Sequence, residues 1–106
     1  MIKHAVLLKF KASLSADERQ ALYQTVADLE QVVDGWLGFA AGDNVSPEVG
    51  MDKGYNGGFI IDFKDETTRD AYLIHPEHQA AAMKLVAAVD GGTDGADGIV
   101  VFDLKA

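Results

Sequence analysis

The chain has 106 residues, a formal charge of −8 and no cysteine. Apolar residues make up 48% of it, enough for the core of one domain over residues 1–106. An acidic surface disfavours nucleic acid and anionic membranes as partners, and the lack of cysteine excludes disulfides and thiolate chemistry. Residues 1–10 are too short and too charged for a signal or membrane segment. We therefore expect a cytoplasmic protein.

The first half of the chain alternates between strand and helix patterns. Polarity alternates over residues 2–10, which predicts a strand with His4 on the same face as four large apolar residues, Ile2, Val6, Leu8 and Phe10. Ser15 and Glu18 form a capping box, and apolar residues at helical spacing predict a helix over 16–33 that ends before Gly35. Residues 36–41 are typical of a second strand, and a polar loop follows them.

The second half repeats the pattern with a break inside its helix. Residues 55–63 alternate and predict a third strand. A short helix is expected over 66–74, and Pro76 interrupts it because proline lacks an N–H and clashes with the carbonyl four residues earlier. A second helical piece over 77–89, a glycine-rich loop over 90–98 and a last strand over 99–104 complete the chain.

The predicted order is β-α-β-β-α-β, the ferredoxin-like α+β arrangement in which an antiparallel sheet carries its helices on one face. The uncovered face combines apolar or small residues with three charged ones: Ala5, Leu7, Gly58 and Ile60 with Lys3, Lys9 and Asp62. A mixed apolar patch on an open sheet indicates an interface, so we expect a homodimer through the sheet faces. The alternative is that a few exposed apolar side chains are ordinary.

The segment from Tyr72 to His78 concentrates groups that can move protons. It holds two of the three histidines and one of the three tyrosines. If Pro76 opens a new helix, His78 lies in its first turn, where the helix dipole favours a neutral imidazole that can accept a proton. His78 could then remove a carbon-bound proton while Tyr72 donates to an enolate oxygen, with His4 completing the site. The alternative is a helix boundary with solvated histidines, a core Tyr72 and a hydrogen-bonded core His4.

A metal site is a weaker alternative for the same segment. His75 and His78 are three residues apart, a spacing that can place two imidazoles on one helix face. Pro76 disturbs that geometry, so neither a metal nor a cofactor is expected.

Four segments, in this order and spacing, resemble the stress-responsive A/B barrel (Dabb) family of dimeric α/β-barrel proteins. They are residues 2–10, Gly42-x-Asn44-x-Ser46, Asp62-Phe63 and Tyr72-x-x-His75-Pro76-x-His78. The resemblance covers essentially the whole chain and implies a ferredoxin-like subunit that dimerises through its sheets. Within this family, the chain is similar to a plant cyclase, an enzyme that performs an intramolecular aldol step. That similarity implies His78 as general base, Tyr72 as its partner and His4 beside them.

The same resemblance implies an apolar substrate pocket between sheet and helices. The expected substrate-binding residues are Val6, Leu8, Leu22, Val26, Phe59 and His75. A histidine, an aromatic residue and a phenylalanine of the plant cyclase are replaced here by Gly57, Val26 and Ala81. We therefore expect a small apolar carbonyl or phenolic ligand and an aldol-type cyclisation or isomerisation, without naming the substrate. The alternative is a non-catalytic stress-response dimer with a structural or binding role.

Overall fold

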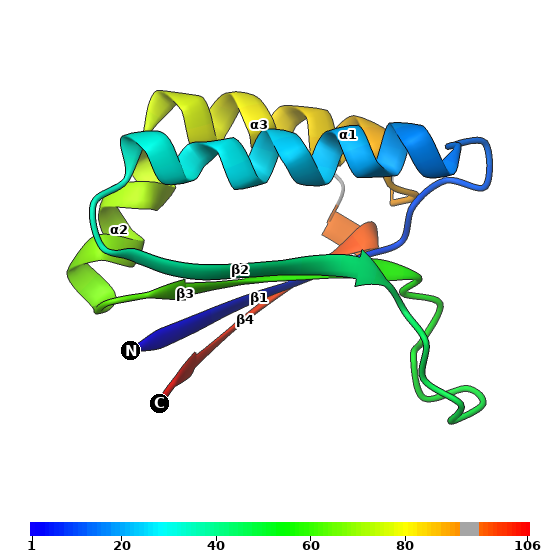
Figure 1. Cartoon of the computed structure of the whole chain (residues 1–106). Coiled ribbons are helices and arrows are strands. Elements are labelled where there is room, and N and C mark those ends of the chain that lie inside the picture. The colour runs from blue at the N-terminus through cyan, green and yellow to red at the C-terminus, as the bar shows by residue number, and fades with distance from the viewer. Residues whose placement is uncertain (92–95) are drawn as a thin grey trace.

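The computed structural model describes residues 1–91 and 96–106. Figure 1 shows a sheet beneath a layer of helices, and the predicted order of elements is confirmed. The elements are β1 (Ile2–Leu8), α1 (Ala16–Ala27), the 3-10 helix η1 (Asp28–Val32), β2 (Trp36–Asp43), β3 (Gly57–Phe63), α2 (Glu66–Ile74), α3 (Pro76–Ala88), the 3-10 helix η2 (Ala96–Gly98) and β4 (Ile99–Lys105).

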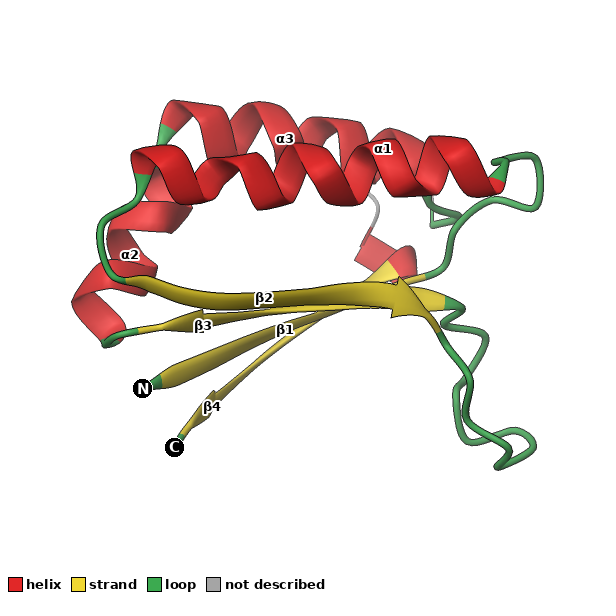
Figure 2. Cartoon of the chain, in the orientation of Figure 1, coloured by secondary structure: helices red, strands yellow, loops and turns green. Residues whose placement is uncertain are grey.

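The four strands form one antiparallel sheet in the order β2-β3-β1-β4. Figure 2 shows α1 and α3 running side by side over one face of this sheet, with α2 at one end. Strand β1 lies at the centre, where His4 pairs with Ile61 on one side and with Asp103 on the other. The expected ferredoxin-like α+β class is therefore confirmed.

Several element boundaries differ from those expected. The helix predicted over 16–33 becomes a 3-10 helix at Asp28, and the chain then turns at Gly35, whose φ is +88°. Strand β1 ends at Leu8, and Phe10 lies outside the strand, where it forms an isolated bridge with Val89. The expected loop over 90–98 lies partly outside the described residues, and its last three residues form η2.

The alternation read from residues 2–10 places the predicted side chains in the core. The four apolar members, Ile2, Val6, Leu8 and Phe10, are all buried. His4 shares their face and is only 3% exposed. The Ser15 capping box is also present, with Ser15 and Glu18 exchanging side-chain and backbone hydrogen bonds. No helix in the described part of the chain has the length and apolarity needed to cross a bilayer.

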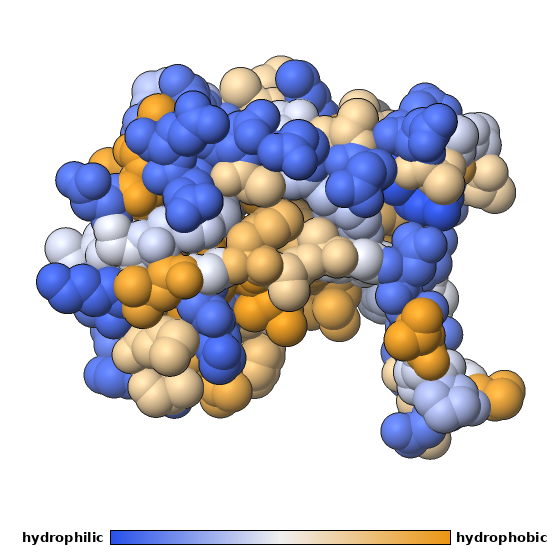
Figure 3. All heavy atoms as spheres, viewed as in Figure 1, coloured by the Kyte–Doolittle hydropathy of each residue, from blue (hydrophilic) through white to orange (hydrophobic). Residues whose placement is uncertain are grey.

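The opposite face of the sheet carries no helix (Figure 2). The connection between β2 and β3 projects from this side, away from the helices, as Figure 1 shows. In Figure 3 the connection stands apart from the body of the molecule, and apolar side chains gather in the layer below the strands. The fold therefore has one covered face, which holds the core, and one uncovered face, which is partly apolar.

Candidate functional site

A cavity of about 210 Å³ lies between the sheet and the helix layer. Its walls come from β1, β3, β4, α1, α2 and α3, and its lining residues are His4, Val6, Val26, Phe59, Tyr72, Leu73, His78, Ala81, Ala82, Leu85, Val86, Ile99 and Val101. Three of these, His4, Tyr72 and His78, carry polar side-chain atoms, and the others are apolar. The structure thus brings the three residues predicted to do chemistry to one small apolar cavity.

Tyr72 is a protonated phenol in this site. Its side chain is 2% exposed, and burial raises its pKa well above the ordinary value. No hydrogen-bond partner for the Tyr72 hydroxyl is found among the described residues. Every side-chain nitrogen or oxygen that is fully enclosed in that part of the chain does have a partner. The Tyr72 hydroxyl must therefore reach open space, and the cavity that Tyr72 lines provides it. It is available to donate a hydrogen bond to a ligand.

His78 lies next to this phenol, with the two ring centroids 4.3 Å apart. Its Nδ1 is 3.0 Å from the carbonyl oxygen of Leu73. Because a carbonyl only accepts, the neutral His78 ring carries its hydrogen on Nδ1 and leaves Nε2 as a proton acceptor. A helix that ran through this point would give the Leu73 carbonyl to the backbone N–H of Glu77, but the His75 ring accepts that N–H instead, at 3.1 Å.

The His78 ring is held in its neutral form. Burial is the largest cause that lowers its pKa below the ordinary value, and the nearby His4 and His75 add to this, although the bond to Leu73 acts in the opposite direction. The sequence indicated a neutral ring from its place in the first turn of a helix, and Pro76 does open α3. The structure assigns the main effect to desolvation.

Not every residue expected to bind substrate lines the cavity. Val6, Val26 and Phe59 do. Leu8 does not, because it is fully buried in the core, and Leu22 packs against the edge of that core. His75 was expected to contact the ligand, but its ring is occupied in capping the first turn of α3.

The sequence analysis missed much of the wall that α3 and β4 provide. Ala82, Leu85 and Val86 lie on α3 together with His78 and line the cavity. Their spacing of four, seven and eight residues from His78 is that of one helix face, so extending the face from His78 would have identified them. On β4, Val101 is 58% exposed and lines the cavity near the edge of the sheet.

The described residues contain no group of three or more His, Asp or Glu side chains placed to hold a metal ion. His75 and His78 each use Nδ1 in a hydrogen bond to the backbone. The spacing that suggested a metal pair is thus explained by the break between α2 and α3.

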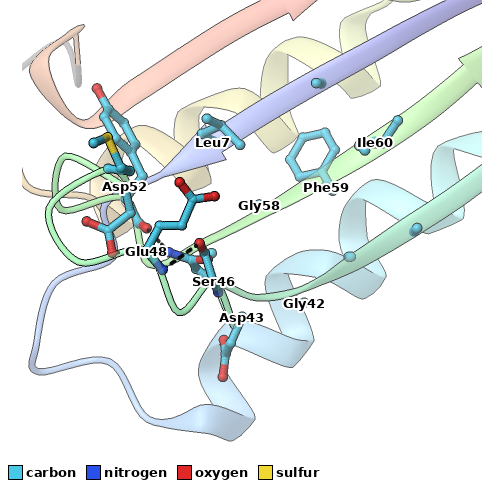
Figure 4. A pocket seen from close by; sticks show the side chains of 16 residues that line it. Leu7, Gly42, Asp43, Ser46, Glu48, Asp52, Gly58, Phe59 and Ile60 are labelled. Atoms are coloured by element: carbon cyan, nitrogen blue, oxygen red, sulfur yellow. Dashed lines mark hydrogen bonds between the residues drawn. The ribbon is translucent and has the colours of Figure 1, made fainter.

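A larger hollow of about 600 Å³ lies on the uncovered face, between the sheet and residues 44–56. Figure 4 shows Leu7 and Ile60 along the strands and the polar side chains of Ser46, Glu48 and Asp52 gathered at the loop. None of the three histidines lines it. Its walls provide apolar contact area and acidic groups, without the imidazoles of the smaller cavity.

Comparison with known proteins agrees with this architecture. Residues 2–106 match the model of the Dabb family, described as the stress responsive A/B barrel domain. The chain is 25% identical to olivetolic acid cyclase from Cannabis sativa over 77 residues, which cover 73% of this chain and 75% of the cyclase. It is 27% identical to the stress-response A/B barrel domain-containing protein HS1 from Arabidopsis thaliana over 89 residues, 84% of this chain and 81% of HS1.

A solved structure is similar over almost the whole chain. The dimeric ferredoxin-like protein from Jannaschia sp. CCS1 is 32% identical, with a TM-score of 0.85, and the match covers 99% of this chain and 98% of that one. Family match, shared sequence and shared fold agree with the resemblance noted in the sequence. The chain belongs to the stress-responsive A/B barrel (Dabb) domain family.

Proposed function

We propose that each protomer binds a small, largely apolar carbonyl or phenolic compound in the 210 Å³ cavity and catalyses proton transfer on it. The observation that carries this proposal is the meeting of Tyr72 and His78 in that cavity, with ring centroids 4.3 Å apart. One supplies a hydrogen-bond donor and the other a proton acceptor, and both are kept uncharged by burial. The similarity to a cyclase supports this class of chemistry.

The proposed step is removal of a proton from the carbon next to a carbonyl. His78 Nε2 takes the proton, and the Tyr72 hydroxyl donates to the oxygen on which negative charge develops. The resulting enolate can attack a second carbonyl, as in an aldol-type cyclisation, or take the proton back at another carbon, as in an isomerisation. Among the residues that the structure describes, no Lys, Arg, Asp or Glu lines the cavity, which favours a neutral ligand over a carboxylate. Its volume is below the roughly 300–1,000 Å³ of pockets for drug-sized ligands, so the ligand is compact.

The uncovered face of the sheet is proposed to pack against a second copy of the chain. Four apolar side chains on this face, Leu7, Ile60, Phe102 and Leu104, are strongly exposed. Two of the three charges that interrupt it are matched within the protomer, because Lys3 Nζ lies 3.0 Å from Asp62 Oδ1. The connection between β2 and β3 projects on the same side (Figure 1), and it contains Val45 and Val49, which are 90% and 97% exposed. Dimeric relatives of the same fold support this arrangement.

The test of the chemical step is exchange of α-protons of phenylacetone for deuterium, followed by NMR in D₂O. Wild-type protein should accelerate exchange, and His78→Ala should lose roughly 10²–10⁴-fold of that acceleration. Ala82→Phe, which fills the cavity without touching the polar groups, should also abolish it, whereas His75→Asn should not. Acceleration that persists in His78→Ala would remove His78 from the mechanism.

Binding of phenylacetone without exchange would leave a binding protein and no catalyst. Binding is followed separately through the NMR shifts of the His78 ring. The second candidate function is a non-catalytic, ligand-binding dimer. The HS1 relative, which is named for a stress response, supports this candidate. Absence of both binding and exchange would contradict the proposal for this ligand class.

A further inference from the structure

A polar cluster lies behind one wall of the cavity, between α2 and the pair of strands β1 and β4. His4 and Asp103 are paired across these strands, and Asp103 Oδ1 lies 2.7 Å from His4 Nδ1. The other carboxylate oxygen, Oδ2, accepts a hydrogen bond from Nη1 of Arg69 on α2. Asp103 therefore connects a histidine that lines the cavity to a guanidinium that does not.

The carboxylate in this cluster is ionised. Burial acts to raise the pKa of Asp103, but the hydrogen bonds from Arg69 and His4 outweigh it and hold the pKa below its ordinary value. An ionised carboxylate only accepts hydrogen bonds, so His4 Nδ1 must carry the hydrogen of the bond to Asp103. The second nitrogen of a neutral His4 ring, Nε2, then has a free lone pair.

By elimination, His4 Nε2 faces the cavity. No partner for His4 Nε2 is found among the described residues, although fully enclosed side-chain nitrogens and oxygens there all have one. His4 is 3% exposed and lines the cavity, and its ring meets Tyr72 edge-on at 5.7 Å. The small accessible part of the ring thus opens on the same space as the Tyr72 hydroxyl and His78.

Arg69 determines how much of the negative charge of the Asp103 carboxylate acts on the His4 ring. A carboxylate alone beside an imidazole favours the imidazolium, which can accept nothing. The guanidinium on Oδ2, which also contacts the Asp70 carboxylate through Nε, offsets part of that negative charge while leaving Oδ1 to orient the ring. The other titratable groups near His4 are Tyr72 on α2, which burial keeps neutral, and His78 on α3. From β3 the ring meets the apolar Phe63.

We propose that Arg69, acting through Asp103, is a positioning residue that holds His4 as the neutral Nδ1–H tautomer and so gives the cavity a second proton acceptor. A ligand that offers two acidic protons or hydrogen-bond donors can then contact His4 and His78 together. The use of this acceptor by a ligand rests on the proposed function, whereas the tautomer itself does not.

The test is ¹⁵N NMR of the three histidine rings in the full chain near pH 7.5, without ligand. For wild-type His4 we expect a protonated Nδ1 and an unprotonated Nε2. In Arg69→Gln the carboxylate is no longer offset, so a fraction of His4 should become doubly protonated and lose its acceptor. Arg69→Lys keeps the charge and should restore the wild-type pattern.

The matched control is Lys105→Gln, which breaks the other ion pair between α2 and β4, from Lys105 Nζ to Glu66 Oε1 at 2.9 Å. It should leave the His4 signals unchanged. A wild-type His4 with its hydrogen on Nε2, or an unchanged His4 in a folded Arg69→Gln protein, would overturn the proposal.

If Arg69→Gln does not fold, Asp103→Asn replaces it as the second variant. It removes the acceptor-only carboxylate, and the His4 signals must then show a mixture of tautomers for the proposal to stand. These spectra need no ligand, so this inference can fail while phenylacetone still binds, and loss of binding does not alter the tautomer result.

Discussion

The hydroxyl oxygen of Tyr23 lies 2.5 Å from the point that a Cβ on Gly57 would occupy. The hydroxyl donates to the carbonyl of Gly42 at 3.0 Å and accepts from the N–H of Gly58 at 3.1 Å, so it is held on both sides. The Phe10 ring fills the adjacent space, 2.8 Å from the same point. The space beside Gly57 is thus closed by two packed aromatic side chains.

Replacing Gly57 with Ala should therefore destabilise the protein. The new methyl group would push against Tyr23 and Phe10, and overpacking of this kind costs about 1–3 kcal/mol. The free energy of unfolding in urea measures the effect. Gly42→Ala is the matched control, because a Cβ at Gly42 has no atom within 4 Å and should change stability little. Equal stability of the two variants would contradict the packing described at Gly57.

The pKa of His78 predicts how stability depends on pH. Because folding lowers this pKa, the unfolded chain binds the proton more readily, so stability falls as pH drops below about 6.5 and continues to fall until the folded pKa is reached. His78→Gln removes the titration but can still donate to the Leu73 carbonyl. We expect its stability to fall less than that of wild type between about pH 7.5 and about pH 5. If the free energy of unfolding in urea falls by the same amount in wild type and His78→Gln as the pH drops, His78 is not buried as described.

The His75 ring stabilises α3 as its N-cap. His75→Ala leaves the N–H of Glu77 without its side-chain acceptor and should cost about 1 kcal/mol, whereas His75→Asn, which keeps an acceptor, should cost much less. Thermal unfolding of the two variants separates these outcomes. If both melt alike, the cap contributes nothing to stability.

The dimer interface can be tested by placing a charge on the uncovered face. Leu7→Asp would bury an uncompensated carboxylate against the second copy, at a cost of about 3–5 kcal/mol, and should yield monomers in sedimentation experiments. Met83→Asp serves as the control, because Met83 is also apolar and exposed but lies on α3, on the other side of the molecule. A dimer that survives Leu7→Asp would place the interface elsewhere.

The sequence predicted the fold well because its signals are local. Alternation in residues 2–10 and the Ser15 capping box identify elements without knowledge of their neighbours. Pro76 likewise marks the start of α3, one residue before the predicted helix. The end of α1 was less predictable, because its tightening into a 3-10 helix depends on how the chain meets Gly35 and β2.

The sequence brought together only those residues of the candidate site that are neighbours in the chain or share a family motif. Tyr72 and His78 flank one helix break, and the structure places them in contact. Asp103 could not be paired with His4 from the sequence, because 99 residues separate them and the pairing depends on the register of β1 and β4. For the same reason the role of Arg69 becomes visible only when α2 is placed over β4.

The interruption of the helix at Pro76 decides which nitrogen of His78 can act as a base. A continuous helix would take the Leu73 carbonyl into its ladder and leave the imidazole free to rotate or to protonate at either nitrogen. A descendant of this chain that kept His78 but lost the break at Pro76 would thus inherit the ring without its orientation. Positions 76 and 78 are therefore expected to change together.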